Sequence, residues 1–183
     1  RDSVASRGLG DVYKRQRQPV DVASLREERA EKTRELVETT GHPLFTLTQE
    51  NEALEKVIAK IREQLDRKVT EAAGTGTAVN GSSNTGENAV SRELLSEIRE
   101  LAIHYAKKGD LLYPLLKVKY GISGPSDVMW TTDDEIRDEL SGLAKAKGQD
   151  EAWKQRMERA LTRAEEMIYK EANILFPNCA VHF

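Results

Sequence analysis

Four segments of the chain place apolar residues at alternating intervals of three and four, and this spacing constrains the fold more than any other feature. Residues three and four apart lie on the same side of an α-helix, so each segment has one apolar face that another element must cover. The faces consist of Leu44, Leu47, Asn51, Leu54, Ile58, Ile61 and Leu65; Leu94, Ile98, Leu101 and Tyr105; Met129, Asp133, Ile136, Leu140 and Leu143; and Trp153, Met157, Ala160, Ala164, Met167, Glu171 and Ile174. We predict an all-α fold, an antiparallel four-helix bundle.

A break in the pattern separates this bundle from the segment before it. Residues 21 to 40 are strongly charged and are predicted to form a short amphipathic helix. Gly41 and Pro43 interrupt it, because proline is tolerated only in the first turn of a helix. We therefore interpret residues 17–40 as the remnant of an N-terminal helical domain and residues 41–183 as the bundle.

Two segments have no apolar periodicity. Residues 70–90 are rich in Gly, Ser, Thr and Asn, which predicts a flexible linker inside the bundle. Residues 1–16, RDSVASRGLGDVYKRQ, resemble a translated sequencing-adapter artefact, with a disordered tail as the alternative. Neither segment contributes to the predicted fold.

The composition is that of a soluble helical protein, and we expect a cytoplasmic location. The chain is 38% hydrophobic and 32% charged, and its net charge of -3 gives no indication of nucleic-acid or membrane binding. Its one cysteine, Cys179, excludes an internal disulfide and a thiolate metal site. No apolar run approaches the roughly 18 residues of a membrane-spanning helix.

Each apolar face contains or adjoins one polar residue: Asn51, His104, Asp133 or Glu171. An unpaired charge costs several kcal/mol to bury, so four such residues are expected to meet and to satisfy each other or a cation. Histidine and carboxylate ligands on facing helices are typical of non-haem iron sites in helical bundles. A capping box at 132–135 would instead begin the third helix late and expose Asp133.

A motif recurs near the ends of the second and fourth helices. HYAKKGDLLYP spans residues 104 to 114 and MIYKEANILFP spans residues 167 to 177; both end in two aliphatic residues, an aromatic residue and a proline. We predict that two helices end there, at the same level of the bundle.

These motifs, with GHPLFTLTQENEAL and the stretch GISGPSDVMWTTDDEIRDEL, resemble the hemerythrin-type HHE cation-binding domain. The resemblance covers about residues 21 to 183. It is closest to proteins in which this bundle is joined to a domain of unknown function (number 438) and often followed by a PAS sensor domain. It implies a possible C-terminal PAS partner.

The resemblance implies a metal site that this chain matches only in part. His104 and Glu171 stand at ligand positions of the family, whereas Lys108 stands at a carboxylate position. The remaining histidine positions are held by Asn51, next to Glu50, by Asp133 and by Met167. The implied metal ligands are His104, Asp133, Glu171 and Glu50, with Asn51, Met167 and Lys108 as second-shell or substitute groups. Non-haem iron is the expected cofactor, and another divalent metal is an alternative.

Several interpretations remain open from the sequence. A salt-bridge network to Lys108 would satisfy both carboxylates without a metal, and His104 with Met167 would be a haem ligand pair. The expected function is a sensory or regulatory module with a degenerate or mononuclear metal site. The alternative is a metal-free structural or dimerisation bundle, with a homodimer as one possible assembly. No activated nucleophile is evident, so we do not expect an enzyme.

Overall fold

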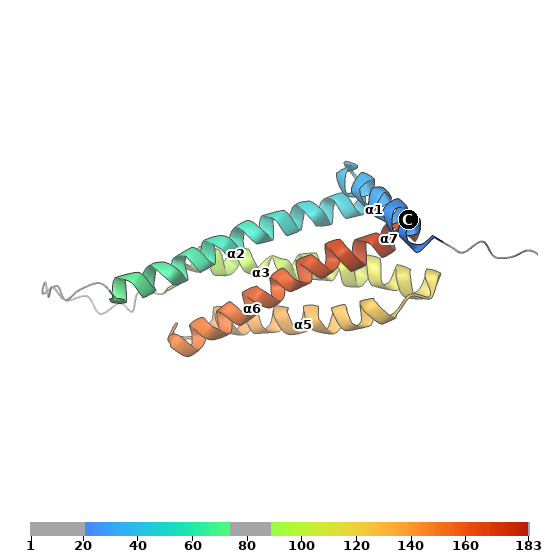
Figure 1. Cartoon of the computed structure of the whole chain (residues 1–183). Helices are drawn as coiled ribbons and strands as arrows, with labels where there is room; N and C mark the ends of the chain where they lie inside the picture. The colour runs from blue at the N-terminus through green and yellow to red at the C-terminus, as the bar shows by residue number, and fades with distance from the viewer. Residues whose placement is uncertain (1–20, 74–88, 183) are drawn as a thin grey trace, which may run out of the picture.

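The computed structural model describes residues 21–73 and 89–182, which form helices and no strand (Figure 1). Helix α1 (Val22–Glu38) is followed by the long helix α2 (Pro43–Ala73). The second leg of the bundle consists of α3 (Arg92–Arg99), α4 (Leu101–Lys107) and the π-helical turns η1 (Lys108–Leu112) and η2 (Leu115–Lys119). The third leg is α5 (Gly124–Lys145), and the fourth is α6 (Glu151–Lys170), η3 (Glu171–Leu175) and α7 (Phe176–His182).

The predicted all-α four-helix bundle is confirmed. The four legs run alternately up and down, as Figure 1 shows. The apolar residues of the predicted faces form one buried core, with the exception of Ile174. Because each buried Leu or Ile contributes about 1.5–3 kcal/mol, these faces supply most of the stabilisation that holds the legs together.

Local signals set where the helices begin. The side chain of Ser91 accepts a hydrogen bond from Leu94 N at 3.3 Å, and that of Asp150 accepts one from Trp153 N at 2.8 Å. These caps satisfy amide groups that have no partner inside the helix. Helix α5 begins at Gly124, so the capping box at 132–135 does not start it, and Asp133 is buried.

The recurring motif marks two π-helical turns and not two helix ends. Tyr113 N–H donates to the carbonyl of Lys108, and Phe176 N–H donates to the carbonyl of Glu171, in each case five residues back. The next residue is proline in both copies, which has no N–H to give and would clash with the carbonyl four residues earlier in a regular α-helix. The wide turn relieves that clash, so the chain stays helical beyond both prolines. The predicted helix ends are therefore wrong.

The π turn also corrects the fourth apolar face. It adds one residue to the turn, so the inward position moves from Ile174, which is 42% exposed, to Leu175, which is 1% exposed.

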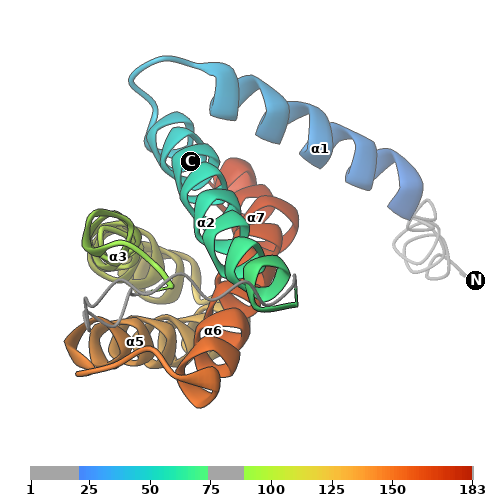
Figure 2. The same ribbon diagram turned by 90° about the vertical axis from the view of Figure 1, so that its left-hand side faces the viewer.

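Helix α1 lies outside the four-leg bundle and crosses one end of it, where it packs against α7 and α2 (Figure 2). The turn between α1 and α2 contains Gly41 at φ +89°, a conformation that favours glycine. Helix α2 continues to Ala73 and so includes the first four residues of the predicted linker 70–90; the rest of that linker to residue 88, and residues 1–16, lie outside the described parts of the chain.

Candidate functional site

The four legs of the bundle bring five polar side chains together in the core. Asn51 comes from α2, His104 from α4, Lys108 from the start of η1, Asp133 from α5 and Glu171 from the start of η3. All five are buried, and Lys108 and Glu171 are 0% exposed. We call these five residues the polar centre.

Glu171 contacts three other members of the polar centre. Its Oε2 accepts a hydrogen bond from Asn51 Nδ2 at 2.6 Å and lies 2.9 Å from His104 Nε2, while its Oε1 accepts one from the Lys108 ammonium. Burial by itself would raise the pKa of Glu171, but the Lys108 charge and the His104 contact outweigh it and lower the pKa. Glu171 is therefore ionised in the core.

Lys108 lies between the two carboxylates of the polar centre. Its Nζ donates to Asp133 Oδ1 at 2.9 Å and to Glu171 Oε1, and it lies 4.3 Å from the centre of the Tyr105 ring. The second oxygen of Asp133 accepts a hydrogen bond from the Tyr113 hydroxyl at 2.8 Å. Burial raises the pKa of Asp133 to about 6, although Lys108 and Tyr113 oppose the rise. Of the two carboxylates in the polar centre, Asp133 is thus the one that gains a proton more readily.

His104 connects the polar centre to a partly exposed edge. Its Nδ1 lies 2.8 Å from Glu50 Oε2, and the other oxygen of Glu50 accepts from Lys107. Burial would raise the pKa of Glu50, but Lys107 and His104 together lower it. A groove of about 280 Å³ between α2 and α4 opens at this edge, with Ile103 among its apolar lining residues.

The structure brings together most of the residues singled out in the sequence. His104, Asp133, Glu171, Glu50, Asn51 and Lys108 form one connected network. Met167 is buried in the apolar core one turn before Glu171, and no contact with the network is described for it. The haem pair of His104 and Met167 has no support here, because both nitrogens of His104 face carboxylates.

Three residues of the network were missed in the sequence. Tyr113, Lys107 and Tyr105 contact Asp133, Glu50 and Lys108, respectively. Tyr105 belongs to the predicted apolar face, but the inward position of Tyr113 depends on the π turn η1. A regular 3.6-residue period gives no signal for that position.

The family model for the hemerythrin HHE cation-binding domain matches residues 42–179. The chain belongs to the hemerythrin HHE cation-binding family. The matched range contains the whole polar centre and begins just before α2, while α1 precedes it. Searches of curated proteins and of solved structures find no match to this chain. None of the helices in the described ranges is long and apolar enough to cross a membrane.

A cation-binding family raises the question of whether a metal ion fits the polar centre of this hemerythrin-family chain. One carboxylate oxygen of Asp133 and one of Glu171 both bind Lys108 Nζ, so the ammonium group lies where a cation shared by the two carboxylates would lie. Within residues 21–73 and 89–182, no group of three or more His, Cys, Asp or Glu side chains is arranged to hold a metal ion. The side chains in this arrangement do not fit a metal.

Proposed function

We propose that the chain is a regulatory, non-catalytic domain of the hemerythrin family with a degenerate metal site, in which the state of the polar centre controls how α1 packs on α7. One observation carries this proposal. Glu171, which contacts three other members of the polar centre, is the first residue of η3, and η3 leads directly into α7. A change at the polar centre therefore acts on the same continuous helix that contacts α1.

The backbone of η3 gives this coupling a physical route. The Glu171 carbonyl accepts the hydrogen bond from Phe176 N–H that closes the π turn. If Glu171 loses a side-chain partner and moves, this wide turn shifts with it, and the position of α7 changes. Single π turns inside α-helices are rare and often occur at functional sites, which agrees with such a role.

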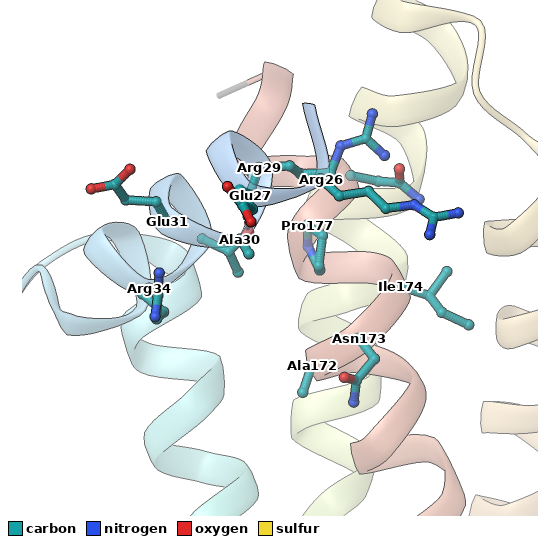
Figure 3. A pocket seen from close by; sticks show the side chains of 12 residues that line it. Arg26, Glu27, Arg29, Ala30, Glu31, Arg34, Ala172, Asn173, Ile174 and Pro177 are labelled. Carbon is teal, nitrogen blue, oxygen red and sulfur yellow. Dashed lines mark hydrogen bonds between the residues drawn. The ribbon is translucent and has the colours of Figure 1, made fainter. Parts of the chain in front are cut away.

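The contact of α1 with the rest of the molecule is weak enough to change. Thr33 is the only described residue of α1 that is buried. A groove of about 960 Å³ separates part of α1 from η3 and α7, and Figure 3 shows Arg26 and Ala30 on one side of it and Ile174 and Pro177 on the other. Elements with few buried apolar contacts open at low free energy, and regulatory movements use such elements. In a longer protein, the PAS domain implied by the sequence resemblance would be one receiver of the change.

Hydrogen exchange measured by mass spectrometry tests this function. Glu171→Gln keeps the shape of the side chain but removes its charge, and it weakens the contacts with Lys108 and His104. We expect faster exchange in α1 and α7 than in the unmodified protein, under conditions where both proteins remain folded. The C-terminal half of α5, at the opposite end of the bundle (Figure 1), is expected to be unchanged.

Two control variants separate coupling from other effects. Glu165→Gln makes the same chemical change on α6, in a partly buried ion pair with Arg62 of α2, and it is expected to leave α1 unchanged. Leu143→Ala removes a buried side chain at the far end of α5 and reports general destabilisation. If Glu171→Gln accelerates exchange only around the polar centre, or in the same pattern as Leu143→Ala, the bundle is structural and the regulatory proposal fails.

A further inference from the structure

The Lys108 ammonium is fully enclosed and has partners on several sides. Two carboxylate oxygens accept from it, and the face of the Tyr105 ring lies against it. A buried lysine costs several kcal/mol unless its charge is neutralised and its donors are used. The arrangement around Lys108 meets both conditions, so its charge is retained in the core.

The carboxylates of the network already face basic side chains. Three carboxylates, those of Glu50, Asp133 and Glu171, face three basic groups. The basic groups are Lys107, Lys108 and the ring of His104. Both nitrogens of that ring face carboxylate oxygens. Each carboxylate of the network therefore has a basic side chain within hydrogen-bonding distance, and the network is complete without a further ion.

We propose that Lys108 is the resident cation of this domain: its ammonium group occupies a latent metal site and keeps metal ions out. The Nζ to Asp133 distance of 2.9 Å is that of a charged hydrogen bond. Removing the ammonium takes a cationic partner from one oxygen of Asp133 and one of Glu171, and His104 Nε2 lies 2.9 Å from the other oxygen of Glu171. Two carboxylates and an imidazole form a donor set that suits Mn²⁺, Fe²⁺ or Zn²⁺.

Metal titration of the chelator-treated protein tests this inference, with Mn²⁺ as the probe because it is stable in air. The unmodified protein and the control Lys60→Ala, which removes an exposed lysine of α2, are expected to show no change in thermal midpoint. Lys108→Ala is expected to bind one equivalent of Mn²⁺ and to gain roughly 5–10 °C at a hundredfold excess over its Kd. Adding Glu171→Gln to Lys108→Ala should remove this gain.

A second measurement uses only the unmodified protein, in case Lys108→Ala does not fold. Acetylation of the native protein, followed by mass spectrometry, is expected to modify Lys108 on the order of a hundredfold more slowly than Lys60, because the enclosed amine reacts only after opening. Equal rates at the two lysines would overturn the proposal. So would stoichiometric Mn²⁺ binding by the unmodified protein that is lost in Glu171→Gln, or a folded Lys108→Ala that binds no Mn²⁺.

This inference concerns the occupant of the polar centre and does not depend on communication with α1. A protected Lys108 together with unchanged exchange in α1 would contradict the regulatory function and leave the resident cation in place. Faster exchange in α1 together with a Lys108 that is acetylated as quickly as Lys60 would contradict only the proposal that Lys108 is the resident cation.

Discussion

Asp133 is the carboxylate of the polar centre whose pKa is raised. Lys108 contacts both Asp133 and Glu171, and the pKa of Glu171 is lowered while burial raises that of Asp133 to about 6. A pKa raised above the usual value of 3.8 means that folding favours the protonated acid. The stability that Asp133 contributes is therefore complete below about pH 3.8 and is lost as the pH rises through about 6.

Asp133→Asn is expected to remove this loss, because the amide imitates the protonated acid and still accepts from Lys108. The free energy of unfolding of the variant, relative to that of the unmodified protein, should be about 1–3 kcal/mol more favourable at pH 7 than at pH 4. Urea unfolding of both proteins at both pH values measures this. Comparing the two proteins cancels the opposite contributions of Glu50 and Glu171, whose pKa values are lowered. Asp138→Asn, an exposed change on the same helix, is the control. A difference between Asp133→Asn and the unmodified protein that is the same at both pH values would contradict this assignment.

At the scale of single elements, a side chain at the start of α6 is hydrogen-bonded to the last turn of α5. Trp153 at the start of α6 is buried, and its Nε1 donates to the carbonyl of Leu143 in the last turn of α5 at 2.9 Å. The Leu143 carbonyl also accepts a long hydrogen bond from Ala146 N at 3.4 Å, and the shorter bond from the indole completes the pairing of this buried acceptor. The indole therefore ties the start of α6 to the last turn of α5.

Trp153→Phe is expected to lower the free energy of unfolding by about 1–3 kcal/mol, since it leaves the Leu143 carbonyl without its side-chain donor. The matched control is Trp130→Phe, which changes a tryptophan that is 45% exposed and packs against Tyr113. Urea unfolding monitored by circular dichroism measures both. Equal losses in the two variants would mean that the hydrogen bond contributes nothing measurable.

The elements also show which parts of the fold could be read from the sequence. The 3–4 spacing predicted the legs and the inward direction of Asn51, Asp133 and Glu171, because a regular helix repeats every 3.6 residues. It failed in the π turns just before Pro114 and Pro177, and in the second of them the added residue moves Ile174 outward and Leu175 inward. Nothing in a regular period predicts such a shift.

The candidate site was predictable to a similar extent. The sequence indicated that His104, Asp133 and Glu171 meet, and it identified Lys108 as a competing partner for the carboxylates. It did not place the ammonium between them, because that position depends on the length and rotamer of one lysine side chain and on how closely the helices approach. The same limit explains why the contact of Tyr113 with Asp133 was missed.

At the scale of the whole molecule, the polar centre is expected to specify how the four legs align more than it stabilises them. Breaking a buried ion pair is costly, whereas replacing the complete set by apolar residues of similar size is often neutral or stabilising. A variant with a fully apolar centre tests this. Its substitutions are Asn51→Leu, His104→Leu, Lys108→Met, Tyr113→Phe, Asp133→Leu and Glu171→Met.

The apolar variant is expected to have a thermal midpoint equal to or above that of the unmodified protein, but with broader side-chain NMR signals. Glu171→Met alone should cost about 3–5 kcal/mol, because it removes one of the two carboxylate partners of Lys108 and of His104 and the acceptor of Asn51 Nδ2. If the full apolar variant is less stable than Glu171→Met alone, the network is a net source of stability. Sharp NMR signals in the apolar variant would show that the legs align without it.

The enclosed charges of Lys108, Asp133 and Glu171 also have a consequence for how the domain responds to heat. Hydration of charged groups becomes less favourable as temperature rises, so taking these groups out of water costs less in a warm solution than in a cold one. The contribution of apolar burial does not grow in the same way. The free energy of unfolding of the natural protein is therefore expected to fall furthest below that of the apolar variant at low temperature. The difference between the two proteins should become smaller as the temperature rises toward the upper end of the range in which the bundle is folded.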